Sequence, residues 1–228
     1  MKLSKRLDQI KSLVGDRYDH IWDCCCDHGL LGAALLQENR TVHFVDIVPK
    51  LMAELEQKLL RFHGAEKWQT HCLDVAKLPL AEYAGRHLII IAGVGGDLMQ
   101  QFIVTLQAQY RHLALDFLLC PVHHQFALRQ QLAELDFGLR DEALVEDNRR
   151  YYEVLLVANQ RQALASVSAV GDKIWQQVGA QQAQMAADYH RKTVQHYQRI
   201  QRGNTADVQH IIDAYQRLEH QPCFELSE

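Results

Sequence analysis

The stretch His20-Ile21-Trp22-Asp23-Cys24-Cys25-Cys26-Asp27-His28-Gly29-Leu30-Leu31 decides the fold. It opens with a short apolar run that predicts a buried strand over 20–24, passes through a polar turn at 27–29 and continues as an expected helix over 30–37. In an open α/β sheet, ligands bind beyond the carboxyl ends of the strands. The polar turn therefore marks one edge of a candidate binding site.

The same alternation of apolar runs and helical periodicity continues on both sides of this stretch. Ser4 is expected to cap an N-terminal helix over 4–14, and Pro49 to open a helix running to Phe62. The further expected strands span residues 42–46, 69–73, 87–91 and 116–120, with another helix over 125–135. Strands that alternate with helices predict right-handed crossovers and a parallel sheet.

Two later runs, 139–145 and 151–158, are separated only by a short polar turn. They predict a hairpin and hence an antiparallel edge, which brings the expected sheet to seven strands. The sequence therefore predicts a fold of the α/β class with a mostly parallel sheet.

Beyond residue 160 the pattern becomes helical. Apolar residues recur every three to five positions from Ile174 to Ile200, Gly203-Asn204-Thr205 breaks the pattern, and the period resumes from Val208 to Leu218. We expect a long helix, a turn and a shorter antiparallel helix. The predicted organisation is a main domain over 1–160 and a coiled-coil-like helical hairpin over 161–228, which leans on the main domain.

The composition is that of a soluble globular protein, with 48% hydrophobic and 23% charged residues in 228. No apolar run approaches the ~18 residues that a membrane-spanning helix needs, so we expect no membrane partner. Three of the six cysteines are adjacent, which favours reduced thiols and a cytoplasmic location over a disulfide framework. The sequence does not predict the oligomeric state.

The net charge of −4 argues against a protein that simply coats nucleic acid, although a local basic face can still steer a polyanion. Residues 186–202 carry one such face, and Lys2, Lys5, Arg6 and Lys11 another. Solvated helix faces without a partner are the alternative interpretation of both.

Carboxylates and glycines follow the expected strands where each one ends. Asp23, Asp46 and Asp74 end the first three strands, and Gly93 follows the fourth. Asp46 is placed to accept both ribose hydroxyls of an adenosine, Asp74 to accept its adenine amine, and Asp23 to bind a cationic amino group. A turn or helix-capping role is the usual alternative for any one of them. Together they favour a nucleoside-type cofactor.

At these residues the sequence resembles the bacterial tRNA (adenine-22-N1)-methyltransferases, and the resemblance covers the whole chain. The matching motifs are Leu3-Ser4-Lys5-Arg6-Leu7; Asp23 with Cys26-Asp27-His28-Gly29 and Leu31; Ile91-Ala92-Gly93-Val94-Gly95-Gly96; Leu128-Arg129; and Tyr152-Glu153. The resemblance implies a class I methyltransferase with a Rossmann-like seven-stranded sheet and a C-terminal helical hairpin. It further implies S-adenosylmethionine as cofactor and N1 of a tRNA adenine as the methylated atom.

The resemblance also assigns roles to individual residues. Those implied to bind the cofactor are Arg6, Asp23, Cys25, Gly29, Asp46, Ile47, Asp74, Val75, Ala92 and Gly93. The catalytic candidates are Asp27 and His28, with a hydrogen bond within the turn as the alternative role of His28. The resemblance implies that Arg191, Lys192, Arg199 and Arg202 bind RNA.

The chain departs from the family pattern at a few positions. Cys25 replaces a glycine, Asp46-Ile47-Val48-Pro49 replaces an Asn and Gly-Pro pattern, and Val122 replaces the Asn after the fifth strand. These departures keep open a second interpretation, an RNA-binding protein that retains the fold without the activity or with another specificity.

Three other interpretations have less support. Cys26, His28, Cys120 and His123 could form a metal site, but they lack paired Cys-x-x-Cys spacing, and we predict no metal. A nicotinamide enzyme lacks its Gly-x-Gly-x-x-Gly motif. The adjacent cysteines rarely reach disulfide geometry, so a redox centre ranks last.

Overall fold

The computed structural model describes residues 2–64, 67–176, 179–203 and 206–220. Its centre is one sheet with the strand order β3-β2-β1-β4-β5-β7-β6-β8. The strands are β1 (His20–Cys24), β2 (Thr41–Asp46), β3 (Lys67–Cys72), β4 (His87–Ala92), β5 (Leu115–Cys120), β6 (Gly138–Asp147), β7 (Arg150–Ala158) and β8 (Ala165–Ser166). β1 to β5 pair in parallel, whereas β7 is antiparallel to both β5 and β6.

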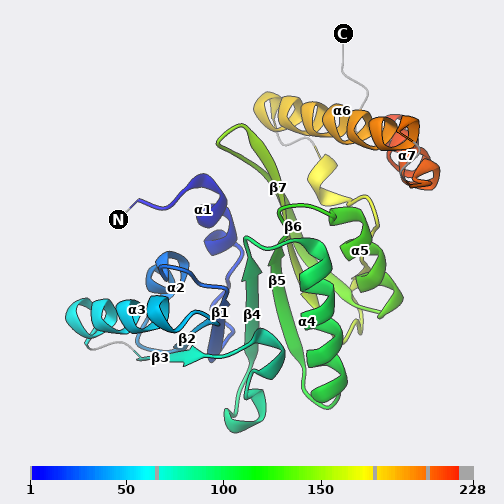
Figure 1. Ribbon diagram of the computed structural model, residues 1–228. Coiled ribbons are helices and arrows are strands. Elements are labelled where there is room, and N and C mark those ends of the chain that lie inside the picture. The colour runs from blue at the N-terminus through cyan, green and yellow to red at the C-terminus, as the bar shows by residue number, and fades with distance from the viewer. Residues whose placement is uncertain (1, 65–66, 177–178, 204–205, 221–228) are drawn as a thin grey trace.

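Helices cover both faces of the sheet (Figure 1). The α-helices are α1 (Lys5–Ser12), α2 (Leu30–Leu35), α3 (Pro49–Phe62), α4 (Gly96–Gln109), α5 (Gln125–Glu134), α6 (Ala180–Arg202) and α7 (Gln209–Gln216). Apolar side chains of α1, α2 and α3 share one core with Ile21, Phe44 and Ile90. Those of α4 and α5 share another with Trp22 and Ile89 on the opposite face. The main domain is therefore a three-layered α/β/α sandwich.

The expected elements are confirmed to within a few residues at their ends, with one exception. The period that predicted the long C-terminal helix starts at Ile174, but this residue lies in a separate 3₁₀ helix (Lys173–Trp175) and α6 begins at Ala180. Ser4 caps α1 by accepting a hydrogen bond from the Leu7 N–H at 3.3 Å, and Pro49 opens α3. The prediction of seven strands was one short, because the two-residue strand β8 pairs with the start of β6. So short a strand has no period of its own in the sequence. The β6–β7 hairpin turns at Asn148 and Arg149, which both have positive φ, as a tight two-residue turn requires.

The C-terminal helices α6 and α7 lie across the carboxyl ends of the strands, beside the tip of the β6–β7 hairpin (Figure 1). They form a third core with Phe126 of α5 and Leu144 of β6, so the helical pair rests on the main domain as expected. The predicted break falls just after α6, and residues 204–205 of it lie outside the described part of the chain. Within that part, no helix is long and apolar enough to cross a membrane.

A buried ionic network joins α6 to the sheet. Arg129 of α5 forms ion pairs with Glu142 of β6 and Glu153 of β7, and all three side chains are fully buried. Tyr189 of α6 donates its hydroxyl hydrogen to the other oxygen of Glu153. The Leu-Arg and Tyr-Glu motifs of the sequence therefore contribute to this junction.

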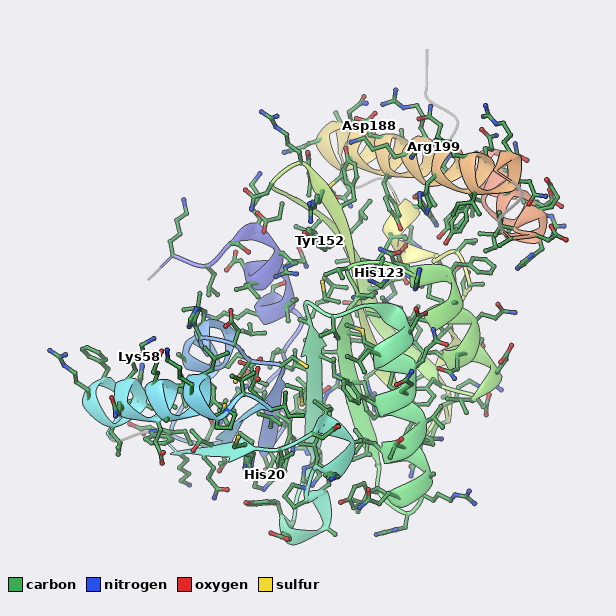
Figure 2. The ribbon with its side chains drawn as sticks, viewed as in Figure 1. His20, Lys58, His123, Tyr152, Asp188 and Arg199 are labelled. Carbon is green, nitrogen blue, oxygen red and sulfur yellow. The ribbon has the colours of Figure 1, made fainter. Side chains whose placement is uncertain are left out.

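A cluster of histidines lies at the opposite, amino end of the sheet, where Figure 2 labels His20. His43 shares hydrogen bonds of 3.0 Å with His20 on one side and His71 on the other, and its ring stacks on Trp22. Burial, together with the neighbouring histidines, lowers the pKa of His43 to about 2. His43 is therefore neutral in the folded protein.

Candidate active site

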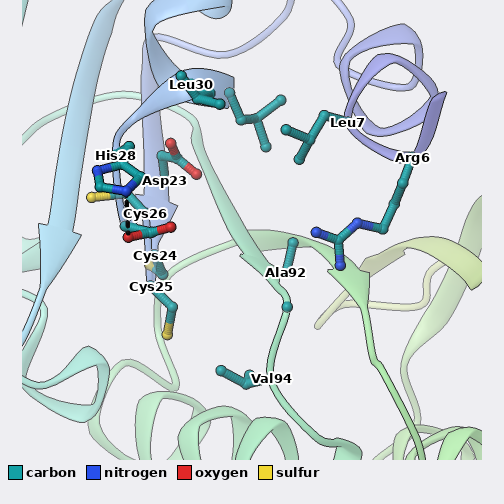
Figure 3. Close-up of a pocket in the computed structure, with 13 residues that line it drawn as sticks. Arg6, Leu7, Asp23, Cys24, Cys25, Cys26, His28, Leu30, Ala92 and Val94 are labelled. Atoms are coloured by element: carbon teal, nitrogen blue, oxygen red, sulfur yellow. Dashed lines mark ion pairs between the residues drawn. The ribbon is translucent and has the colours of Figure 1, made fainter. Parts of the chain in front are cut away.

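A cavity of about 300 Å³ opens at the carboxyl end of the sheet, between β1 and β4 (Figure 3). β2 lies on one side of β1 and β4 on the other, so the strand order reverses direction at this point. Open α/β sheets form their binding crevice at such a point. It is lined by Arg6, Leu7, Asp23, Cys24, Cys25, Cys26, Asp27, His28, Leu30, Leu31, Ala92, Gly93 and Val94. We call it the cleft. Seven predicted site residues line it.

The loop after β1 turns sharply to reach α2. Cys25, Asp27 and Gly29 all have positive φ, between 50° and 68°. At Gly29 a Cβ atom would lie 2.5 Å from a methyl carbon of Leu55, so only glycine fits without displacing α3. A non-glycine residue at positive φ is strained, so Cys25 carries a conformational cost that a glycine at this position would not have.

Asp23 is almost fully buried at the end of β1. Its Oδ2 accepts a hydrogen bond of 2.8 Å from the Gly32 N–H in the first turn of α2. Burial nevertheless raises the pKa of Asp23 from 3.8 to about 7. A bound cation would favour the ionised form, so Asp23 can serve an ammonium group that reaches the cleft.

Three carboxylates converge on the thiol of Cys25. Burial, together with the negative charges of Asp46, Asp23 and Asp74, raises the pKa of Cys25 to about 11. The ends of β1, β2 and the loop after β3 therefore lie close together, as their positions at one sheet edge predict. The thiol is protonated at neutral pH, which argues against a nucleophilic role.

Asp46 and Asp74 also organise the local backbone. Asp46 accepts hydrogen bonds from the N–H groups of Asp27 and Val48, at 3.2 and 3.0 Å. Asp74 caps a short 3₁₀ helix by accepting from the Ala76 N–H at 2.8 Å. Asp74 therefore has the helix-capping role that the sequence offered as the alternative to ligand binding. Each carboxylate oxygen has a second lone pair, so these contacts do not exclude a ligand.

The residues that follow Asp46 and Asp74 in the chain differ in how far they are exposed. Ile47 is 66% exposed and can cover a flat ring, whereas Val75 is buried in the core below α4. Only the main chain of Val75 can meet a ligand. Asp46, Ile47, Asp74 and Val75 lie outside the cleft itself.

Arg6 forms the opposite wall of the cleft. Figure 3 shows its guanidinium extending from α1 toward Ala92, with Asp23 on the far side. The guanidinium also lies 5.0 Å from the centre of the Tyr152 ring. The space beside Gly93 on the floor of the cleft is open, because a Cβ added there would meet no atom within 4 Å.

Asp27 and His28 lie at the mouth of the cleft. Their side chains are 68% and 56% exposed, and His28 Nε2 lies 3.7 Å from Asp27 Oδ1 (Figure 3). Both are accessible to a substrate that approaches from solvent. The pair is too long for a strong hydrogen bond, so each side chain can turn toward a ligand.

The loops after β4 and β5 are joined to one another. The Val122 N–H donates to the Val94 carbonyl at 3.0 Å, and the Gly96 N–H donates to the His123 carbonyl at 2.9 Å. At Gly95 a Cβ would lie 2.2 Å from the His123 ring, which explains the small residue there. Val122, which replaces the family's Asn, is 40% exposed beside the cleft.

The four predicted RNA-binding residues lie on α6. At about 100° of rotation per residue, Arg191, Lys192, Arg199 and Arg202 fall within an arc of about 100° on one side of the helix. All four are exposed, and Arg191 is paired with Asp188. The helix thus presents a basic stripe away from its buried face.

Sequence reasoning missed a group of functional candidates at the hairpin tip. A second cavity, beside α6, is lined by Lys192 together with Arg149, Arg150 and Tyr151. The run Arg149-Arg150-Tyr151-Tyr152, two cations followed by two aromatic residues in a turn, was the available signal.

The four candidate metal ligands come from two separated strands. β4 lies between β1, which leads to Cys26 and His28, and β5, which leads to Cys120 and His123. In the described residues, no group of three or more His, Cys, Asp or Glu side chains is arranged to hold a metal ion.

The strand order, the antiparallel β7 and the cleft at the β1–β4 junction define the class I methyltransferase fold. Residues 3–155 match the family model described as a methyltransferase domain. The chain therefore belongs to this methyltransferase family. None of the curated proteins matches the chain.

Solved structures share the fold over nearly the whole chain. A candidate tRNA (m1A22) methyltransferase from Streptococcus pneumoniae is 19% identical, with a TM-score of 0.73, and the match covers 96% of this chain and all of the other. M. capricolum TrmK, solved with S-adenosyl-homocysteine, is 16% identical (TM-score 0.68; 96% and 98% covered). The B. subtilis m1A22 tRNA methyltransferase TrmK is 20% identical (TM-score 0.67; 95% and 94% covered). The C-terminal helices are thus part of the shared architecture.

Proposed function

We propose that this protein is an S-adenosylmethionine-dependent methyltransferase that acts on N1 of an adenine in tRNA. The observation that carries the proposal is the pair of opposite charges across the cleft, Arg6 on one wall and Asp23 on the other. A zwitterionic amino-acid group needs this arrangement, with its carboxylate at the guanidinium and its ammonium at the carboxylate. Similar structures hold S-adenosyl-L-methionine or S-adenosyl-homocysteine, which carry such a group.

The residues beside the cleft fit the rest of that cofactor. Asp46 would accept the ribose hydroxyls, Asp74 the adenine amine, and Ile47 would cover the adenine ring, while the Val75 main chain borders it. Ala92 and Gly93 leave room along the floor, since a Cβ at Gly93 meets nothing. Cys25 and Gly29 would border the amino-acid end through the loop after β1. The cavity of about 300 Å³ is present with the Cys25 side chain in place, so this departure does not fill it.

Bound S-adenosylmethionine supplies an electrophilic methyl group. N1 of the adenine attacks with its lone pair, the N–C bond forms as the C–S bond breaks, and the positive charge passes to the adenine ring. No proton has to leave N1, so the protein's task is to orient the base and stabilise the charge. We assign that task to Asp27, which would accept a hydrogen bond from the exocyclic amine, and a positioning role to His28.

The cofactor part of the proposal is tested by calorimetric titration of S-adenosyl-homocysteine. Wild type should bind at micromolar concentrations and Asp46→Ala should not, while Glu54→Ala, an exposed change on α3, should bind as wild type does. If a folded wild type shows no binding, the non-catalytic alternative gains and the proposal fails.

The catalytic part is tested by turnover of Asp27→Ala with unmodified tRNA. Removing one charge-stabilising contact should lower kcat about 100-fold or more and leave the affinity for S-adenosyl-homocysteine unchanged. Undiminished turnover would remove Asp27 from the mechanism.

A further inference from the structure

A second cavity, of about 520 Å³, lies between α6, the tip of the β6–β7 hairpin and the loop after β5. We call it the aromatic cavity. Tyr151, Tyr152 and Tyr197 contribute partly exposed rings to its lining. Figure 2 labels Tyr152 and His123, two of its lining residues, below α6. No role in cofactor binding requires this second cavity.

Cations surround these rings. Arg149 and Arg150 come from the hairpin tip, and Lys192 of α6 lies 4.5 Å above the Tyr151 ring. None of the described residues that line the cavity is acidic, although the whole chain has a net charge of −4. Two carboxylates beside the lining residues are already engaged, since Asp97 pairs with His124 and Glu153 is held in the buried network.

The aromatic cavity adjoins the cleft through two contacts. The Val122 N–H donates to the carbonyl of Val94, and these two residues line the aromatic cavity and the cleft respectively. The guanidinium of Arg6 in the cleft lies over the ring of Tyr152 in the aromatic cavity. An RNA chain that places its target base at the mouth of the cleft therefore has its next nucleotide within reach of the aromatic cavity.

We infer that the aromatic cavity binds the nucleotide adjacent to the methylated adenine, with its base against the tyrosine rings and its phosphate between Arg149, Arg150 and Lys192. Aromatic faces joined to cations are the arrangement that single-stranded nucleic acid requires, because each nucleotide offers a stacking base and an anionic phosphate. The inference rests on the proposed action on tRNA. It implies that the RNA is unstacked at two successive nucleotides, as in a loop or bulge, and not only at its target.

The phosphate contact is tested with a fluorescently labelled unmodified tRNA transcript, whose binding is followed by anisotropy at several salt concentrations. Arg149→Gln/Arg150→Gln should weaken binding and reduce the slope of log K against log salt by up to about one, because the single phosphate held there releases about one counterion. The matched control is Lys58→Gln/Arg61→Gln on α3, which removes the same charge far from the cavity (Figure 2). An equal effect in both pairs would overturn the inference, since only net charge would then matter.

The stacking contact is tested with Tyr151→Leu/Tyr197→Leu, which keeps the apolar volume. Loss of stacking should weaken tRNA binding at least about fivefold and leave the salt slope unchanged. Tyr151→Phe/Tyr197→Phe keeps both rings and should bind as wild type does. If the leucine pair folds, as judged by thermal melting, and binds tRNA normally, the inference is wrong.

These outcomes are separate from those of the proposed function. All variants should bind S-adenosyl-homocysteine with wild-type affinity, because none of the changed residues lines the cleft. If wild type methylates tRNA and the aromatic-cavity variants do so with unchanged KM, the proposed function stands and this inference fails. If wild type transfers no methyl group but the cavity variants still lose tRNA binding, the proposed function fails and only an RNA contact at the aromatic cavity remains.

Discussion

Replacing Asp23 with Asn is expected to remove a proton-linked step from cofactor binding. In the free protein, burial raises the pKa of Asp23 to about 7, so about half of the molecules carry a neutral Asp23 at pH 7. An ammonium group in the cleft would favour the carboxylate and lower that pKa. Binding of S-adenosyl-homocysteine should therefore release about half a proton per site at pH 7.

The magnitude follows from the fraction of ionised Asp23. With a pKa of about 7, binding should be about tenfold weaker at pH 6 than at pH 8, equivalent to about 1.4 kcal/mol. The sign is fixed because only the ionised form, which lower pH depletes, pairs with the ammonium group. Asp23→Asn can still accept the Gly32 N–H but cannot titrate, so its weaker binding should not change over this range.

Isothermal titration in two buffers with different ionisation enthalpies measures both the affinity and the protons released. 5′-Methylthioadenosine, which lacks the amino-acid group, is the matched control ligand and should show little pH dependence. Equal affinity of S-adenosyl-homocysteine at pH 6 and pH 8, with no proton release, would refute the assignment of Asp23 to the ammonium group.

Three further predictions concern stability, each measured by unfolding of the purified protein. Arg129→Met should lower the free energy of unfolding by about 3–5 kcal/mol, because it leaves two buried glutamates unpaired. Arg161→Met, which removes an exposed ion pair, should lower it by less than about 1 kcal/mol. Similar losses in the two variants would contradict the role of the buried network. Lowering the pH from 7.5 to 5.5 should lower the free energy of unfolding by about 1.4 kcal/mol through His43 alone. The lowered pKa keeps His43 neutral in the folded protein, whereas the same residue in the unfolded chain takes up a proton below pH 6.5. This loss should be absent in His43→Gln. Gly96→Ala should destabilise the protein more than Gly95→Ala does. A Cβ at position 96 would lie 2.6 Å from a backbone oxygen, whereas a Cβ at position 95 would meet a histidine ring that can move. The reverse order of stabilities would contradict the loop packing.

The fold was predictable because its signals are local. The strand from His20 to Cys24, the proline that opens α3 and the cap at Ser4 each follow from residues next to one another in the sequence. The carboxylates at the strand ends were predictable for a related reason, since parallel strands bring their carboxyl ends to one edge. The convergence of Asp23, Asp46 and Asp74 on Cys25 is the structural result of that rule.

Other features depend on contacts between distant residues, which one sequence does not reveal. The hydrogen-bonded ring pair of His20 and His43 lies on neighbouring strands 23 residues apart, and no period marks it. The aromatic cavity joins the hairpin tip to α6, although Tyr151 and Lys192 are 41 positions apart and each resembles an ordinary surface residue. The burial of Val75 also escaped prediction, because the packing of α4 over it sets its exposure.

Whether N1 of a tRNA adenine receives the methyl group is tested by nucleoside analysis after the reaction. Unmodified tRNA transcripts are incubated with the purified protein and isotopically labelled S-adenosylmethionine, digested to nucleosides and separated by mass-coupled chromatography. Wild type should produce labelled 1-methyladenosine, and Asp27→Ala should produce almost none. Label in another nucleoside, or no label from a wild type that binds both S-adenosyl-homocysteine and tRNA, would contradict methylation at N1.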